Sequence, residues 1–147
     1  MMVVEFQPEH LKQLMLRTHD KPSFDFFSMI LEERTKVCKD DFAFSGISDN
    51  NEVIACAGVF KLWEGVGEAW VFGSELIYKY PIWFHKQVIK TLSMIFEKGK
   101  FHRIQAIVRS SFFESQEWVE RLGFTLEGKL EKYTPEQEDC FIYRMVN

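Results

Sequence analysis

The stretch that decides the fold runs from residue 103 to residue 128 and reads RIQAIVRSSFFESQEWVERLGFTLEG. Its first part, residues 103–108, is apolar and short, which predicts a strand. Residues 113–122 are predicted to form a helix, and Gly123 follows as the residue best suited to the left-handed backbone that ends a helix. Phe124 begins a further predicted strand. A helix between two strands indicates an α/β architecture.

The rest of the chain extends this alternation. Predicted strands cover residues 2–6, 42–47, 53–63, 68–73, 103–108, 124–130 and 140–146. Predicted helices cover residues 8–17, 24–37 (with Ser23 as its cap), 81–98 and 113–122, and residues 74–80 are a predicted loop. The order β-α-α-β-β-β-α-β-α-β-β predicts a mixed sheet with helices on both faces, an α/β (α+β) fold in one domain, 1–147.

Two connections give this order its topology. Short turns separate the three strands between residues 42 and 73, which predicts an antiparallel meander. The helix 81–98 joins the strands 68–73 and 103–108, which predicts a right-handed crossover between parallel strands.

Composition and charge exclude several classes of protein. The chain has 147 residues, is 46% hydrophobic and 27% charged, and is therefore neither disordered nor fibrous. Its net charge of −4 gives no general attraction to nucleic acid or to anionic lipid, so neither a nucleic-acid partner nor a membrane is expected. The four histidines lack metal-ligand spacing, so no metal is expected. Three scattered cysteines and the lack of a signal sequence predict a cytoplasmic protein that is not secreted.

The segment 114–128, ESQEWVERLGFTLEG, resembles the helix–Leu-Gly-Phe–strand ending of the GNAT superfamily of N-acetyltransferases. The likeness is carried by Leu122, Gly123, Phe124, Glu127 and Gly128. Ser115 and the strand RIQAIV are similar to the branch that acetylates ribosomal proteins. The resemblance implies the GNAT-like acyl-CoA N-acyltransferase fold, with acetyl-CoA as the cofactor of an active member.

In that family acetyl-CoA lies where the fourth and fifth strands splay apart, which here are 68–73 and 103–108. The resemblance implies that backbone groups of Val71, Phe72 and Gly73 hold the pantetheine arm. The pyrophosphate in the family rests on a helix start built from an Arg or Gln and two spaced glycines, because glycines let the backbone approach the anion.

The equivalent segment of this chain, IYKYPIWFHK at 77–86, contains no glycine, and Pro81 has no N–H to donate. The phosphate cradle is therefore expected to be absent or rebuilt. Lys79 and Lys86 are candidates for a substitute that holds phosphate through side-chain cations. The alternative is that both lysines are solvated surface residues.

The chemistry of an N-acetyltransferase also needs a general base and a general acid. Glu68 and Glu75 are the candidate catalytic bases, and the alternative for each is a surface carboxylate. The resemblance puts Val119, with Trp118 beside it, where the family often has a tyrosine acid. Tyr133 and Tyr143 are both predicted to be strand residues.

Two functions follow. One is an acetyl-CoA-dependent N-acetyltransferase that acts on an amine of a protein or a small molecule. The other, which the missing glycines favour, is a GNAT-fold protein without a cofactor that serves as a structural or interaction module. Residues 69–74, AWVFGS, with the glycine-free loop after them, resemble the GNAT-like internal virion proteins of short-tailed bacteriophages. This resemblance implies a phage-encoded protein in the host cytoplasm or the virion, with a protein partner or self-association through the aromatic loop 77–84.

Overall fold

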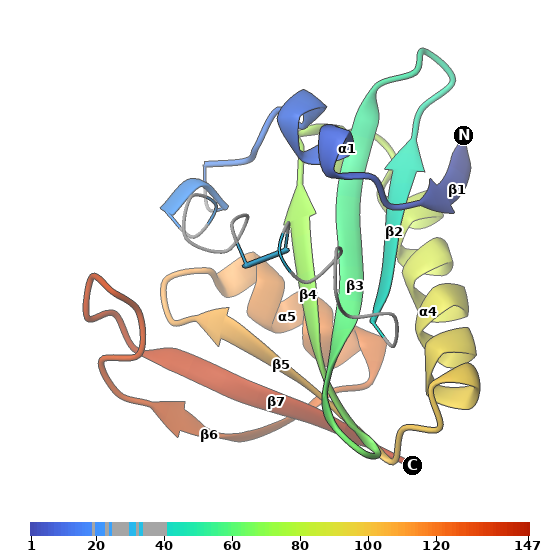
Figure 1. Ribbon diagram of the computed structural model, residues 1–147. Helices are drawn as coiled ribbons and strands as arrows, with labels where there is room; N and C mark the ends of the chain where they lie inside the picture. The colour runs from blue at the N-terminus through green and yellow to red at the C-terminus, as the bar shows by residue number, and fades with distance from the viewer. Residues whose placement is uncertain (19, 23, 25–29, 32, 34–40) are drawn as a thin grey trace.

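The computed structural model describes residues 1–18, 20–22, 24, 30–31, 33 and 41–147 (Figure 1). Its strands are β1 Met2–Glu5, β2 Phe42–Ile47, β3 Val53–Trp63, β4 Val66–Gly73, β5 Arg103–Arg109, β6 Thr125–Leu130 and β7 Cys140–Val146. Its helices are α1 Pro8–Gln13, α3 Leu76–Lys79, α4 Pro81–Lys98 and α5 Phe113–Leu122. All seven strands form one sheet in the order β1-β2-β3-β4-β5-β7-β6.

The sheet has the predicted mixed α/β topology. Strands β1 to β4 form an antiparallel meander, and β4 pairs with β5 in parallel. The helix α4 makes the crossover between these two parallel strands. Strand β7 lies between β5 and β6 and is antiparallel to both. The predicted meander and the predicted crossover are therefore confirmed.

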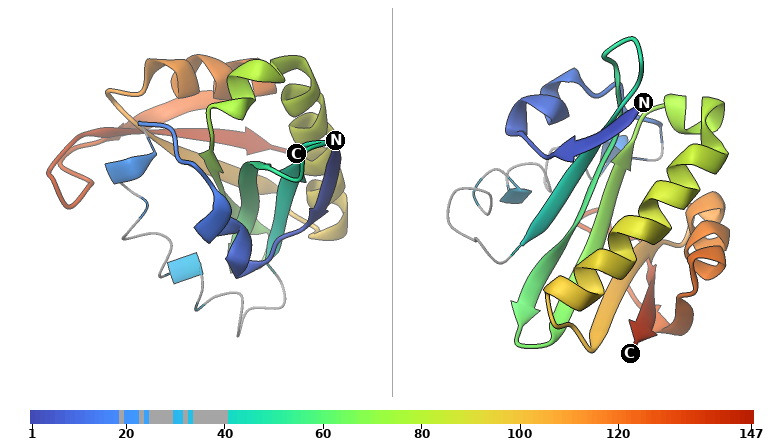
Figure 2. Two further views of the ribbon diagram at one scale, coloured as in Figure 1. Left: turned by 90° about the horizontal axis from the view of Figure 1, so that it is seen from above. Right: turned by 90° about the vertical axis from the view of Figure 1, so that its right-hand side faces the viewer.

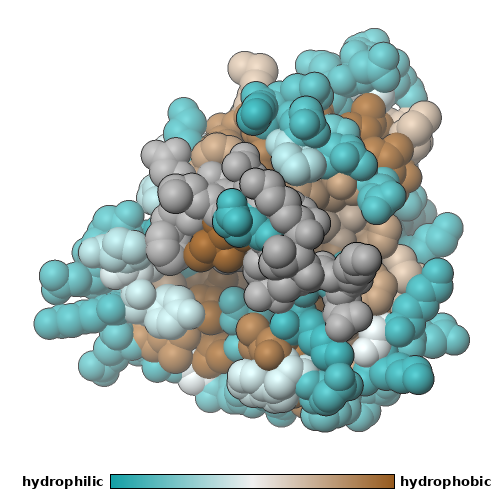
Figure 3. Space-filling model, in the orientation of Figure 1, coloured by the Kyte–Doolittle hydropathy of each residue, from teal (hydrophilic) through white to brown (hydrophobic). Residues whose placement is uncertain are grey.

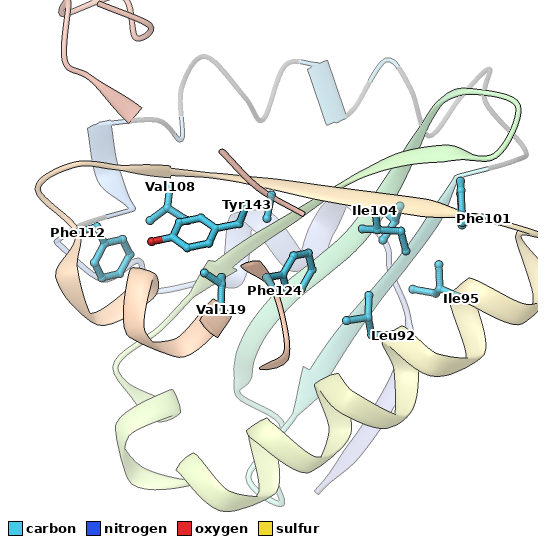
Figure 4. Close-up of a cluster of buried hydrophobic side chains, with 11 residues drawn as sticks. Leu92, Ile95, Phe101, Ile104, Val108, Phe112, Val119, Phe124 and Tyr143 are labelled. Atoms are coloured by element: carbon cyan, nitrogen blue, oxygen red, sulfur yellow. The ribbon is translucent and has the colours of Figure 1, made fainter. Parts of the chain in front are cut away.

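Helices cover the sheet on both faces. Figure 2 shows α4 and α5 on one face of the sheet and α1 on the other. The core under α4 and α5 is built from alternate residues of β5, since successive side chains of a strand point to opposite faces. Ile104 and Val108 pack there against Leu92 and Ile95 of α4 and against Val119 of α5 (Figure 4).

The structure corrects the predicted helix 8–17, because α1 ends at Gln13. Leu14 has extended backbone angles, and Leu16 forms an antiparallel bridge with Ser74 at the end of β4. Met15, within the predicted helix, is 80% exposed. Tertiary pairing with β4 has overridden the local helical signal.

Five further boundaries differ. Strand β1 ends at Glu5 rather than at residue 6, and β5 extends to Arg109 rather than to residue 108. The predicted loop 74–80 contains the short helix α3, and β4 begins at Val66 rather than at residue 68. Strand β6 begins at Thr125, one residue later than predicted. The predicted helix 24–37 and its cap Ser23 lie largely outside the described residues. Among the helices that the structure describes, none is long and apolar enough to cross a lipid bilayer.

Candidate functional site

Strands β4 and β5 separate part of the way along their length. Their pairing runs from Val66 with Arg103 to Ala69 with Ala106 and stops there. Beyond these residues β4 continues to Gly73 and stays paired with β3, while β5 continues beside β7. We call the gap between residues 70–73 and 107–109 the β4–β5 opening. Its position is the one that the sequence predicted for a cofactor.

A cavity of about 320 Å³ lies at this opening. Its walls come mainly from β2, β3, β4, β5, α4 and α5, with Asp20, Pro22 and the turn at 134–135, and they include Val71, Phe84, Val88, Val108, Trp118 and Val119. The lining is mainly apolar, and the volume is at the lower end of the range of roughly 300–1,000 Å³ found for small-molecule pockets. On the face shown in Figure 3, polar residues make up most of the outline, and apolar residues show in several separate patches.

The backbone of β4 offers fewer free groups to this cavity than the sequence predicted. Both backbone polar groups of Gly73 are already bonded, because Arg17 N–H donates to the Gly73 carbonyl at 2.9 Å and Gly73 N–H donates to the Asp20 carboxylate at 2.9 Å. The backbone groups of Phe72 point the other way, toward β3, since neighbouring residues of a strand alternate in direction. Val71 points into the opening, where β5 no longer pairs with it. Of the three predicted residues, only Val71 presents a backbone without a partner among the described residues.

Arg17 and Asp20, which bond the backbone of Gly73, form a buried ion pair. The Arg17 Nε donates to the Asp20 carboxylate at 2.9 Å, and the two side chains are only 9% and 8% exposed. The Arg17 guanidinium also lies over the aromatic rings of Tyr78 and Phe112, at 5.9 and 5.1 Å from their centroids. Arg17 and Asp20 thereby connect to the end of β4, and Arg17 also contacts α3 and the residue before α5.

Tyr78 extends this connection to α5. Its hydroxyl donates to the Glu114 carboxylate at 2.7 Å. Burial raises the pKa of Tyr78 above its usual value, and the hydrogen bond to Glu114 raises that pKa further. The phenol therefore stays protonated at neutral pH and keeps its role as the donor.

Aromatic side chains and a proline surround the start of α4. Tyr80 is the N-cap residue without a side-chain cap, and Pro81 is the first helical residue. The Phe84 ring stacks on the Trp118 ring at a centroid distance of 5.3 Å and an angle of 21°. The Trp118 indole N–H then donates to Nδ1 of His85 at 3.2 Å. These contacts join α4 to α5, and Phe84 and Trp118 both form part of the cavity wall.

The predicted lysines lie outside this cavity. Lys79 and Lys86 are both exposed, and neither forms part of its wall. The Lys79 ammonium lies 5.4 Å from the ring centroid of Tyr80. Their role in holding phosphate therefore stays a prediction.

The two predicted carboxylates have different surroundings. Glu68 is partly buried, forms part of the cavity wall and accepts a hydrogen bond of 2.9 Å from the Gln105 side chain. Glu75 is exposed at the start of α3 and is absent from that wall. The structure therefore does not bring the two together, and of the two only Glu68 faces the cavity.

The sequence interpretation missed Gln105, and it assigned Tyr133 to a strand. Tyr133 lies instead in the turn between β6 and β7, next to Lys132, whose φ of 49° marks the bend. Burial raises the pKa of Tyr133, and the negative charge of Glu68 raises it further. The Thr134-Pro135 dipeptide that follows is a turn signal that could have identified this position.

Cys56 and Cys140 are buried free thiols, and Cys140 forms part of the cavity wall. Cys56 is fully buried, and burial raises its pKa to about 11, so its thiol stays protonated at neutral pH. Within the described ranges, no group of three or more His, Cys, Asp or Glu side chains is placed to hold a metal ion.

Comparison with solved structures identifies the fold. A variant of the spermidine N-acetyltransferase of Vibrio cholerae superposes with a TM-score of 0.73 at 12% identity, over 99% of this chain and 95% of that one. A GNAT-family acetyltransferase from Bacillus anthracis gives a TM-score of 0.73 at 16% identity, with coverages of 98% and 93%. The ribosomal-protein-S5-alanine acetyltransferase of Vibrio fischeri also gives 0.73 at 16%, with coverages of 99% and 92%.

The chain has the GNAT acetyltransferase fold. The agreement extends over nearly the whole chain, so the predicted fold class is confirmed. No protein-family model matches the sequence, and no curated protein matches it at the significance threshold used.

A nucleotide thioester fits this GNAT fold only in part. Val71 offers the backbone pairing that a pantetheine arm needs, but Gly73 does not. Pro81, the first residue of α4, has no N–H to donate to a phosphate. Among the described residues, Val71 thus offers its backbone to a cofactor, while Gly73 and Pro81 do not offer the N–H groups that the resemblance implies.

Proposed function

We propose that this chain is a non-catalytic GNAT-fold protein that acts as a structural or interaction protein of a short-tailed bacteriophage. The observation that supports a non-catalytic function lies at the end of β4. There Arg17 and Asp20 hydrogen-bond both backbone groups of Gly73. A ligand that pairs with Gly73 must first displace the Arg17 backbone N–H and the buried Asp20 carboxylate from it, which leaves buried polar groups without these hydrogen bonds.

The phage assignment rests on the sequence of the same region. The segment 69–74 with the glycine-free loop after it resembles internal virion proteins of such phages. The proposed location is accordingly the host cytoplasm or the particle, and the proposed partner is a protein. The exposed side chains of Tyr78 and Ile82, 46% and 71% exposed, offer apolar contact surface in the loop 77–84.

An acetyl-CoA-dependent N-acetyltransferase is the second candidate. It is favoured by the unpaired backbone of Val71 and by a cavity that reaches Glu68. Glu68, held by Gln105, is the group that would accept the proton of an acceptor amine. Burial and the negative charge of Glu68 raise the pKa of Tyr133, which keeps its phenol protonated.

Binding of acetyl-CoA distinguishes the two functions. We expect no heat of binding in calorimetry and no shift of the melting curve at millimolar acetyl-CoA. A cofactor at 100 times its dissociation constant would instead raise the free energy of unfolding by about 2.7 kcal/mol. Such a rise would contradict the non-catalytic function. Release of free CoA in the presence of spermidine, lost in Glu68→Gln, would establish the second candidate.

A further inference from the structure

The side of the sheet that faces α4 carries small residues. In β3, Ala57 lies on the same face as Val59, which packs in one core with Leu92 of α4, since alternate residues of a strand share a face. The cavity wall contains further glycine and alanine residues of β2, β3, β4 and β5, namely Gly46, Ala55, Ala69 and Ala106. Side chains this short leave space between the sheet and the helix.

This space lies under the middle of α4. Ala57 and Ala69 are only partly buried, although both belong to interior strands of a sheet that a helix covers. Toward its end α4 packs closely, with Leu92 and Ile95 in one buried core with Ile104 (Figure 4). We call the part of the cavity that lies between α4 and the sheet at Ala57 and Ala69 the α4 hollow.

The wall of the α4 hollow combines aromatic rings with a few polar groups. The Trp83 ring lies over Gly46, where an added Cβ would be 3.4 Å from the ring. Phe84 stacks on Trp118 on the side of α5. On α4 itself, Gln87 and Thr91 bring an amide and a hydroxyl group to the wall. A largely apolar lining with a small number of hydrogen-bonding groups is typical of a small-molecule pocket.

The charged groups of the cavity wall are committed to other contacts or lie on the other face of the sheet. Arg109 donates to the Glu138 carboxylate at 3.0 Å, and Asp20 is paired with Arg17. Glu68 points away from the α4 hollow, because neighbouring residues of a strand alternate between the two faces. An ionised ligand would lose its hydration in the α4 hollow without gaining an opposite charge from the described wall residues.

From this size and lining we infer that the α4 hollow binds an uncharged organic molecule with an apolar body and one hydroxyl or carbonyl group. An apolar cavity of about 150 Å³ already binds benzene. The whole cavity here has about 320 Å³, so it has room for a longer hydrocarbon chain. Such a molecule gives the wall the packing contacts that an empty cavity lacks. Its binding goes beyond the proposed interaction role and needs neither a phosphate site nor the backbone of Gly73.

Methyl NMR with 1-octanol as the probe tests this inference. In the wild-type chain labelled at alanine and valine methyls, we expect the Ala57, Ala69 and Val88 signals to move along one saturating curve. Ala43, which packs against the core on the α1 side of the sheet, is the control and should keep its position. Octanoate, with a chain of the same length and a negative charge, should bind at least tenfold more weakly. Signals that do not saturate, or that move no more than Ala43, would overturn the inference.

Variants that fill the α4 hollow separate binding there from binding elsewhere. Ala57→Val adds volume from the sheet, and Val88→Met adds it from α4 with a side chain that adapts to irregular gaps. Each should raise the dissociation constant of 1-octanol at least threefold. Circular dichroism melts show which variants fold, and two substitutions from opposite walls keep the test decisive if one of them does not. Unchanged affinity in a folded variant would contradict the inference, whereas an acetyl-CoA titration tests only the non-catalytic function.

Discussion

Replacing Asp20 by alanine is expected to lower the free energy of unfolding by about 3–5 kcal/mol. The substitution leaves the guanidinium of Arg17 buried without its carboxylate, and it removes the acceptor for Gly73 N–H. Loss of one partner of a buried ion pair is far more costly than loss of a surface pair. Urea denaturation of the wild-type chain and the variant measures the difference.

The double variant Arg17→Met/Asp20→Leu is the control for this effect. It removes both charges together and keeps apolar volume in the same place, so it should be clearly more stable than Asp20→Ala. A loss of less than about 1 kcal/mol in Asp20→Ala would show that the pair is hydrated. The end of β4 would then be accessible, and the non-catalytic function would lose its main support.

Replacing Phe84 by alanine is expected to destabilise the chain by about 3–5 kcal/mol. Phe84 is only 8% exposed, packs among buried residues of β3 and α3, and stacks on Trp118. Its removal leaves a void between α4 and α5 and also withdraws the stacking contact. A thermal melt followed by circular dichroism measures the loss.

Phe113 is the matched control, because it belongs to the neighbouring helix and is 71% exposed. Phe113→Ala should change the stability by no more than about 0.5 kcal/mol. Equal losses of stability in Phe84→Ala and Phe113→Ala would contradict the claim that the Phe84–Trp118 stack is buried and stabilises the packing of α4 on α5.

The sequence predicted the helices of the fold best where periodicity and end signals agreed. The bounds 81–98 and 113–122 match α4 and α5, since Pro81 starts one helix and Gly123, at φ 107°, ends the other. The helix 8–17 was wrong after residue 13, because the bridge of Leu16 with Ser74 depends on a strand far away in sequence.

The candidate site was predictable in place but not in detail. The order of elements located the β4–β5 opening, whereas the expectation that the phosphate cradle is absent or rebuilt stays a prediction. The closure of Gly73 could not be predicted, because Asp20 lies 53 residues from it and an ordinary Arg-x-x-Asp spacing carries no sign of burial. The same holds for the Phe84–Trp118 stack, which joins two helices whose packing only the fold determines.

The non-catalytic function depends on Gly73, whose carbonyl and N–H are occupied by Arg17 and Asp20 and so do not bind a ligand. Amide NMR of the labelled wild-type chain, titrated with acetyl-CoA to millimolar concentration, tests it most directly. We predict that the Gly73 and Val71 amide signals keep their positions and that the Gly73 amide exchanges slowly with solvent, as expected for a bond to buried Asp20. Movement of both signals along one saturating curve would contradict the claim and identify a working acyl-CoA site.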